Sequence, residues 1–368
     1  MMISRRNFLA VAGAAAAAAA LTACGGSSSS TSTASSTASS AASEAASKIT
    51  KVALTCDTGT IDDESFNQAC WTAVSSYMGD DCQYYIPEAD ASDEVRKTKI
   101  RQAVNDGADV IVCVGYLYGA SLAWAAEQYP DVKFIAIDVT QGDIGTDEIP
   151  SNCYCITFKE EQAGYLAGYA IAKDGKTKLG FLGGMAVPAV IRYGYGFVQG
   201  ADAAAAELGQ NIEINYFYGG QFYGDDSITA RMEGWYADGT QVVFACGGGI
   251  WTSALDAAET HDGKVIGVDV DQRSKIGERC LTSAMKGLPS AINNALDSYF
   301  SGNFSELGGT AQQLGLKDGD YIGLPTDSES WGFTTFTQDQ YETVLAGIRD
   351  GSIEISSDTE NQPEVGSH

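Results

Sequence analysis

Positive charge and histidine are both scarce in this 368-residue chain. Lysine and arginine together number 22, against 48 aspartates and glutamates, which gives a net charge of −26 at pH 7. Nucleic acids and anionic lipids are bound through basic surfaces, so this composition argues against both as partners. A neutral small ligand is easier to accommodate than an anionic one. His261 and His368 are the only histidines, which leaves too few candidates for a metal site or for Ser–His chemistry.

The motifs of common nucleotide-binding and hydrolytic enzymes are missing as well. No strand-to-helix turn carries the Gly-x-Gly-x-x-Gly spacing of a dinucleotide site, and no P-loop, Gly-x-Ser-x-Gly or zinc motif occurs. The sequence therefore predicts no cofactor, no metal and no enzymatic activity. A hydrolase that uses Asp57 or Asp269 is the alternative.

No apolar run near the N-terminus is long enough to remain in a bilayer. Arg5–Arg6 precede the apolar run Val11–Ala20, and Leu21–Cys24 matches a lipobox. We expect residues 1–23 to be a signal peptide and Cys24 to be lipidated, which would anchor the protein on the extracytoplasmic face of the cell membrane. An ordinary signal peptide with a coincidental cysteine is the alternative, and use of the twin-arginine route is open. Residues 24–47, rich in Ser, Ala and Thr, predict a disordered tether.

Eight cysteines follow Cys24. No Cys-x-x-Cys pair occurs among them, and spacing does not define disulfide connectivity. Several lie at or near predicted strand ends, where cysteine acts as a small buried residue. We therefore expect mostly free, buried thiols. The eight are Cys56, Cys70, Cys82, Cys113, Cys153, Cys155, Cys246 and Cys280.

From residue 51 onward, short apolar runs alternate with helical periodicity. The predicted strands are 52–55, 83–86, 110–114 and 133–137, followed by 178–183, 212–217, 241–245 and 264–268. The predicted helices are near 64–78, 92–107, 118–129, 160–173, 188–209, 226–238 and 251–260. This alternation predicts parallel sheets with helices on both faces. About 320 residues exceed what one core usually organises, so we predict two Rossmann-like α/β lobes.

The segment after the first strand combines several ligand-type side chains. The strand ends at Asp57, a loop with Asp62 and Asp63 follows, and Phe66 and Asn67 begin a helix. Ligands bind at the carboxyl ends of parallel strands, so Asp57, Phe66 and Asn67 are candidate contacts for a ligand with polar edges and a flat ring. The alternative is a capped turn, in which Asp62 or Asp63 caps the helix and Phe66 packs as a hydrophobic staple.

Other predicted strand ends, and the short run at residues 281–284, are followed by further candidates. These are Asp138, Gly247, Gly248, Gly249, Asp269 and Lys286. Alternatives remain for each: the two aspartates as helix N-caps, the lysine as a surface residue, and the glycines as a tight turn.

The sequence resembles the basic membrane protein family of substrate-binding lipoproteins, which includes bacterial purine-nucleoside receptors. The family's opening motif stands at residues 57–68, and segments 158–170, 179–200 and 265–287 match further motifs in the family's order. The resemblance implies a type I periplasmic-binding-protein architecture, with two lobes joined by a hinge. Lobe one is predicted at 48–157 plus about 282–318, lobe two at 158–281 plus about 319–356, and a frayed tail at 357–368.

The resemblance also implies the function. It implies a monomeric receptor that binds a nucleoside, by analogy a purine, and delivers it to the permease and ATPase of an ABC importer. In nucleoside-binding members, aromatic rings sandwich the base and carboxylates hold the ribose. Phe66 would be one ring and Phe222 the second, with Trp251 as an alternative wall; Asp57, Asn67 and Asp138 would be polar contacts, and Gly247–Gly249, Asp269 and Lys286 would meet the sugar or the far edge. A sensor for a signalling partner, or a receptor for another small polar ligand such as a sugar, is the alternative.

Overall fold

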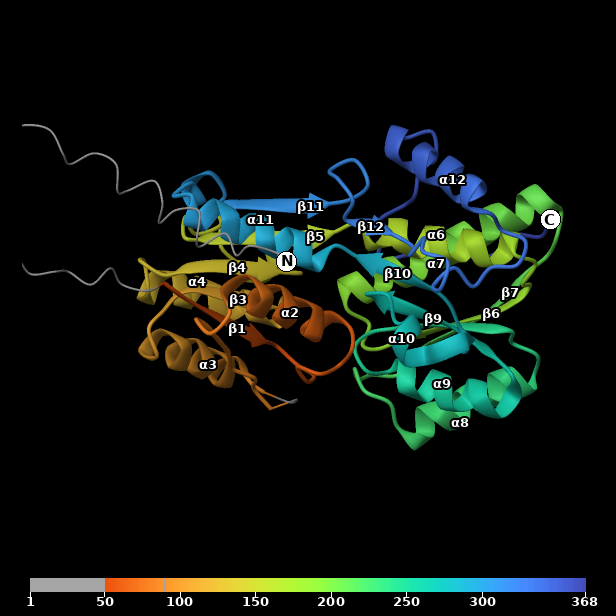
Figure 1. Ribbon diagram of the computed structural model, residues 1–368, viewed down its shortest axis with the longest axis horizontal. Helices are drawn as coiled ribbons and strands as arrows, with labels where there is room; N and C mark the ends of the chain where they lie inside the picture. The colour runs from red at the N-terminus through yellow and green to blue at the C-terminus, as the bar shows by residue number, and fades with distance from the viewer. Residues whose placement is uncertain (1–49, 89–90) are drawn as a thin grey trace, which may run out of the picture. The chain divides into compact units, whose positions relative to one another are not determined.

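The computed structural model describes residues 50–88 and 91–368, so the predicted signal peptide, Cys24 and the tether lie outside the described residues. The described chain forms two α/β lobes, each built on a six-stranded sheet (Figure 1). The strand order is β11-β5-β4-β3-β1-β2 in the first lobe and β12-β10-β9-β8-β6-β7 in the second. Within the described residues, neighbouring strands are parallel except for the antiparallel pair β10 and β12.

The first lobe has helices on both faces of its sheet. Its strands are β1 (Lys51–Cys56), β2 (Cys82–Tyr84), β3 (Ala108–Val114), β4 (Lys133–Ile137), β5 (Cys153–Phe158) and β11 (Thr310–Leu314). Its helices are α2 (Phe66–Met78), α3 (Asp93–Asn105), α4 (Gly119–Gln128), α5 (Gln141–Ile144) and α11 (Leu288–Phe300), with short 3₁₀ turns at Tyr116–Tyr118 and Phe304–Glu306. α2 and α11 cover one face, and α3 and α4 cover the other. The central strands are therefore continuous apolar runs, as burial on both sides requires.

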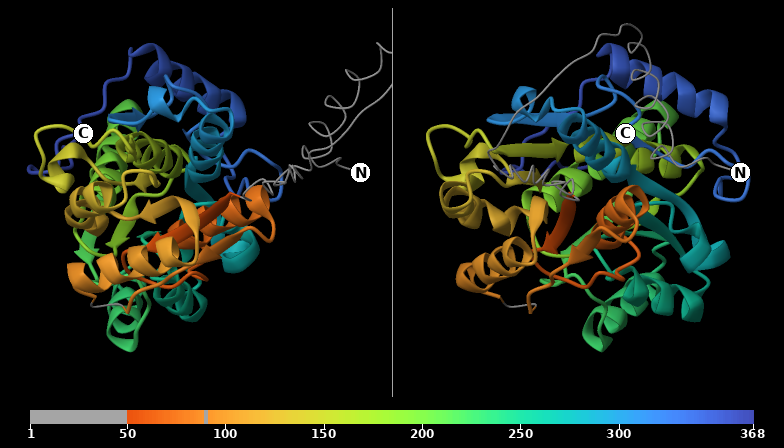
Figure 2. Two further views of the ribbon diagram at one scale, coloured as in Figure 1. Left: turned by 90° about the vertical axis from the view of Figure 1, so that its left-hand side faces the viewer. Right: turned by 60° about the vertical axis from the view of Figure 1, so that its left-hand side comes forward.

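The second lobe repeats this plan. Its strands are β6 (Lys178–Gly183), β7 (Glu213–Tyr218), β8 (Val242–Cys246), β9 (Lys264–Asp269), β10 (Cys280–Lys286) and β12 (Ile322–Gly323). Its helices are α6 (Glu160–Lys173), α7 (Pro188–Leu208), α8 (Asp226–Ala237), α9 (Trp251–His261), α10 (Arg273–Ile276) and α12 (Gln338–Asp350), with a 3₁₀ turn at Gly277–Arg279. α6 and α7 cover one face, and α8 and α9 the other. α12 packs outside α6 (Figure 2).

The chain passes between the lobes three times. It crosses between β5 and α6, between β10 and α11, and between β11 and β12. The predicted return near residue 282 falls inside β10, which pairs with β9 and β12 in the second sheet. The return therefore follows Lys286, because the strand must finish before the chain can leave its sheet.

Helices α6 and α7 pack closely because each offers glycines to the backbone of the other. A Cβ at Gly164 would lie 2.0 Å, and one at Gly168 2.1 Å, from a carbonyl oxygen of α7. A Cβ at Gly196 or Gly200 would lie 2.1 Å from a carbonyl oxygen of α6. Only glycine allows this approach. The packing places the N-terminal parts of both helices, which carry Glu160 and Tyr193, next to each other.

The C-terminal tail, which the sequence predicts to be frayed from residue 357 onward, lies against α7 in the structure. Ser356 and Gln199 of α7 exchange two hydrogen bonds of 2.8 and 3.0 Å. The Gly366 N–H donates to Asp202 at 2.7 Å, and the Val365 side chain packs against the core. Gly366 and His368 of this tail are both bonded to Asp202 of α7.

Two other properties of the described residues bear on the predictions. All eight cysteines are free thiols, and all but Cys82 are buried. Among the described residues, no helix is long and apolar enough to cross a membrane.

Candidate functional site

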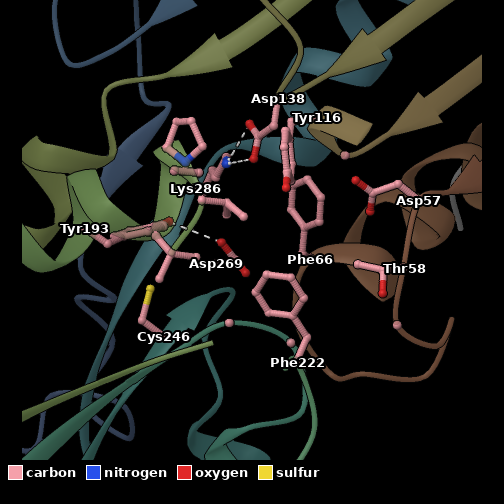
Figure 3. Close-up of a pocket in the computed structure, with 18 of the residues that line it drawn as sticks. Asp57, Thr58, Phe66, Tyr116, Asp138, Tyr193, Phe222, Cys246, Asp269 and Lys286 are labelled. Atoms are coloured by element: carbon pink, nitrogen blue, oxygen red, sulfur yellow. Dashed lines mark hydrogen bonds and ion pairs between the residues drawn. The ribbon is translucent and has the colours of Figure 1, made fainter. Parts of the chain in front are cut away.

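A cavity of about 140 Å³ lies between the two lobes, at the carboxyl ends of both sheets (Figure 3). In the first lobe the strand order reverses between β1 and β3, and in the second between β6 and β8. The loops diverge at such a point and leave a crevice that can hold a ligand. Residues at the ends of β1, β3, β4, β8, β9 and β10 line the cavity.

Asp57 follows β1 and is 5% exposed. Its Oδ2 accepts a hydrogen bond from the backbone N–H of Leu117 at 3.0 Å. A Cβ at Gly115 would lie 2.2 Å from the Asp57 carboxylate, and Gly115 has a φ of +105°, so only glycine fits beneath this side chain. Burial raises the pKa of Asp57 to about 7, although the Leu117 N–H and the charge of Arg96 lower it. Near neutral pH, Asp57 can therefore accept a hydrogen bond or donate one.

The loop after Asp57 is held by two side chains at the start of α2. Asp63 accepts three backbone N–H groups near the start of α2 at 2.9–3.0 Å, which satisfies amides that have no partner within the helix. Asp63 therefore binds the free N–H groups of α2, as the capped-turn alternative expects, although Ser65 and not Asp63 is the N-cap residue. Asn67 lines the cavity, and its side-chain NH₂ donates to the carbonyls of Thr58 at 2.9 Å and Thr60 at 3.1 Å. Asn67 thus braces the loop as well as forming part of the wall.

Lys286 ends β10 and belongs to a buried charge cluster. Its Nζ donates to both oxygens of Asp138, at 2.6 and 2.8 Å, and to Glu160 at 2.8 Å. Arg192 Nε donates to the other oxygen of Glu160 at 2.6 Å. Two cations therefore lie against the buried carboxylate of Glu160, and Lys286 also pairs with the half-buried carboxylate of Asp138. A buried charge needs such partners. Lys286 is 3% exposed and is not a surface lysine.

The protonation of this cluster follows from its geometry. Burial alone would lower the pKa of Lys286, but Asp138 and Glu160 raise it above its ordinary value. Burial raises the pKa of Asp138 to about 6, while Lys286 lowers it. Lys286 also lies 5.0 Å from the ring centroid of Phe66 and 4.9 Å from that of Phe158, so the charge faces two aromatic rings. Because Asp138 is in the first lobe and Lys286 in the second, their ion pair joins the lobes.

Asp138 and Asp269 occupy equivalent places at the ends of β4 and β9. Both have left-handed backbone conformations, with φ of +59° and +66°. Neither is a helix N-cap, because Thr140 caps α5 and Gln272 precedes α10. Burial raises the pKa of Asp269, while Lys286 lowers it. Left-handed conformations are uncommon for residues other than glycine, and they concentrate at binding sites.

Phe222 packs against several glycines on the second-lobe side of the cavity. A Cβ at Gly184 would come within 2.4 Å of the Phe222 ring, and one at Gly247 within 2.9 Å. A Cβ at Gly248 would lie 2.8 Å from the Phe222 carbonyl oxygen. The Gly249 N–H donates to that same oxygen at 2.9 Å. The run of three glycines therefore fixes the position of the ring.

Two predicted site residues do not line the cavity. Gly249 only supports the backbone of Phe222, and Trp251 begins α9 with its ring against the core beneath that helix. Trp251 Nε1 instead donates to the carbonyl of Asp63 at 3.4 Å, which links the second lobe to the loop of the first. The prediction of Trp251 as a cavity wall is wrong, because the glycine run turns the chain before the helix starts.

Several cavity residues are not predicted from the sequence. Tyr116 follows β3, where the sequence predicts no ligand contact, and Arg192 and Tyr193 lie within α7. A tyrosine or arginine inside a long helix carries no signal for a ligand site. The only pointer to the α7 residues is that they fall in the 179–200 segment that resembles the family. The residues at 50–88 and 91–368 include no group of three side chains placed to hold a metal ion.

Comparisons with known proteins identify the family of this chain. Residues 49–357 match the family model described as "ABC transporter substrate-binding protein PnrA-like". Basic membrane protein A of Borreliella burgdorferi is 31% identical over 279 residues, covering 74% of this chain and 78% of that protein. A Lactococcus lactis protein named "ABC transporter nucleoside-binding protein BmpA" is 29% identical over 334 residues, covering 83% of this chain and 89% of that protein.

The fold is also found among solved structures. An ABC transporter solute-binding protein from Aeropyrum pernix superposes with a TM-score of 0.72 at 20% identity, covering 84% of this chain and 94% of that one. One from Conexibacter woesei gives a TM-score of 0.67 at 23% identity, covering 84% and 99%. The predicted two-lobed architecture of periplasmic solute-binding proteins is therefore confirmed.

Proposed function

The chain belongs to the family of PnrA-like ABC transporter substrate-binding proteins, and from this premise we propose that it binds a purine nucleoside between its lobes for delivery to an ABC importer. A nucleoside combines a flat base with a sugar that carries hydroxyl groups. The cavity offers surfaces for both parts, and the Lactococcus lactis relative carries a nucleoside-binding name.

The observation that carries this proposal is the pair of phenylalanines at the cavity. Phe66 comes from the first lobe and Phe222 from the second, and both are half-buried with a face toward the cavity. Aromatic side chains stack on any base and contribute about 1–3 kcal/mol per stack. A flat ligand held by one ring from each lobe would stabilise the closed arrangement of the lobes.

The polar groups are distributed as a nucleoside requires. In the view of Figure 3, the two rings lie between Asp57 on one side and Asp269 with Lys286 on the other. A base between the rings would place its polar edge toward Asp57 and its sugar toward Asp269. With a pKa of about 7, Asp57 can match either a donor or an acceptor on that edge. Asp269 can accept hydrogen bonds from hydroxyl groups of the ribose.

We further propose that Cys24 anchors the protein by lipid to the extracytoplasmic face of the membrane. This fits an importer receptor, which must stay close to its permease. Cys24→Ala is expected to release the protein from the membrane fraction, since the tether after it offers no other lipid attachment. A variant that stays in the membrane fraction would contradict the anchor without affecting the ligand proposal.

Mass spectrometry of the small molecules released on denaturation tests the ligand proposal. We expect a purine nucleoside from the wild-type protein and much less from Phe222→Ala purified in parallel. Release of a free sugar, or of equal amounts of nucleoside from both proteins, would contradict the proposal. Isothermal calorimetry with the identified compound then gives its affinity.

A further inference from the structure

Asp269 is held by one hydroxyl group from each lobe. Ser65 Oγ donates to its Oδ2 at 2.7 Å, and the Tyr193 hydroxyl donates to its Oδ1 at 3.2 Å. Ser65 is 1% exposed and Tyr193 is 2% exposed, so water does not compete readily for either bond. Ser65 directly precedes α2 in the first lobe, whereas Tyr193 and Asp269 belong to the second. The contact from Ser65 therefore exists only while the lobes are together.

The two hydrogen bonds orient the Asp269 carboxylate and leave part of each oxygen free to accept another hydrogen bond. A carboxylate has two oxygens with about four acceptor positions. One protein donor on each oxygen leaves a free position on each, and Asp269 lines the cavity. In the view of Figure 3 its carboxylate lies between Tyr193 on one side and the Phe222 ring on the other. Two parallel acceptor positions match two neighbouring hydroxyl groups of one ligand.

We infer that Ser65 is a positioning residue that makes the site selective for ligands with vicinal hydroxyl groups. Its hydroxyl fixes the plane of the Asp269 carboxylate, and it can do so only across the closed interface. Selection of a diol such as the 2′,3′-diol of ribose therefore takes place on closure, not on first contact with an open lobe. This inference rests on the proposed nucleoside function and deepens it.

The residue next to Ser65 provides a matched control. Lys275 Nζ lies 2.8 Å from Glu64 Oε1, and Gln272 Nε2 donates to the Glu64 carbonyl at 2.9 Å. These contacts join the lobes at the same place but do not touch Asp269. Loss of the Lys275–Glu64 ion pair should weaken closure for every ligand equally. Loss of the Ser65 hydroxyl should in addition weaken binding of ligands that carry the diol.

Calorimetry on the purified full-length chain separates these effects. The probes are adenosine, guanosine and inosine, each paired with its 2′,3′-dideoxy form, and the measured quantity is the affinity ratio within a pair. In Ser65→Ala the ratio should fall about tenfold or more, the loss expected for a hydrogen bond to a charged group. In Lys275→Ala both affinities should fall together and the ratio should stay constant. Ser65→Thr, which keeps the hydroxyl, should retain the wild-type ratio.

The outcomes that overturn the inference are distinct from failure of the proposed function. If Ser65→Ala leaves the ratio unchanged, with or without a general loss of affinity, Ser65 is only an interlobe contact and the inference is wrong. An equal fall of the affinity ratio in Ser65→Thr, which keeps the hydroxyl, would also overturn the inference. If Ser65→Ala does not fold, Ser65→Cys takes its place, because cysteine has nearly the same shape as serine and is only a weak hydrogen-bond donor. An unchanged affinity ratio in Ser65→Cys would then overturn the inference. If the wild-type protein binds none of the six nucleosides, the proposed function itself has failed.

Discussion

Replacing Asp57 by asparagine should stabilise the ligand-free protein at neutral and alkaline pH. Burial raises the pKa of Asp57 from its ordinary value of 3.8 to about 7. Between these values the folded protein keeps a proton that the unfolded chain releases, so the stability of the wild type falls as the pH rises through this window and stays lower above it. Asparagine is neutral at every pH and can still accept the hydrogen bond from the Leu117 N–H.

The magnitude follows from the two pKa values. They differ by about three, and each tenfold change in proton affinity corresponds to about 1.4 kcal/mol, so the difference approaches about 4 kcal/mol above pH 7. Below pH 4 both proteins carry a neutral group at position 57, and their stabilities should converge. The same substitution should weaken nucleoside binding if Asp57 accepts a hydrogen bond from the base. Stability and function would then change in opposite directions.

Urea denaturation of the ligand-free proteins between pH 4 and pH 8 measures this difference. The free energy of unfolding of Asp57→Asn minus that of the wild type should rise with pH and level off near pH 7–8. Asp62→Asn is the matched control, because Asp62 is an exposed aspartate of the same loop. Parallel pH profiles for the wild type and Asp57→Asn would refute the reasoning, since they would mean that Asp57 titrates alike in the folded and unfolded chains.

Phe66→Ala and Phe222→Ala should each weaken nucleoside binding by about 1–3 kcal/mol, because each removes one stacking face. Calorimetry on the folded variants measures this, and an unchanged affinity would leave the rings with a packing role alone. Lys286→Met should lower the free energy of unfolding by about 3–5 kcal/mol, since it leaves the buried Glu160 and the half-buried Asp138 without their shared cation. Chemical denaturation measures this difference. A variant as stable as the wild type would contradict the prediction, since it would mean that Asp138 and Glu160 find other partners or water. Saturating nucleoside should make the particle more compact in small-angle scattering, because a ligand that touches both lobes favours closure. No change in the radius of gyration would favour a pocket confined to one lobe.

Much of the fold is predictable from local pattern. The continuous apolar runs at β1, β3, β4, β8 and β9 are visible in the sequence because these strands are buried on both faces. β11, with the sequence Thr310–Leu314, is not predicted, because it is an edge strand whose first four residues are exposed. α12 is not assigned from the sequence either. Hydrophobic periodicity reports burial, so an exposed edge strand leaves little trace in it.

The candidate site also has a part that can be predicted from the sequence and a part that cannot. Asp57, Asp138 and Asp269 are predictable because they stand at strand ends, where an open sheet presents its ligands. Which group each carboxylate pairs with is not predictable, because the partners come from distant parts of the chain. Lys286 meets Asp138 from 148 residues away, and Ser65 meets Asp269 from 204 residues away.

The sequence by itself determined the alternation of strands and helices, the two-lobed class and the strand ends that carry carboxylates. These properties depend on neighbours along the chain and on the two periodicities of burial. The tertiary structure alone decided which of these groups share a cavity, which carry a raised pKa and which join the lobes. In the folded protein, Asp63 accepts hydrogen bonds from the first N–H groups of α2. Trp251 donates a hydrogen bond across the lobes to Asp63, and Tyr193 donates one to Asp269. Contact and desolvation between residues far apart in sequence are set by packing, which no local pattern encodes.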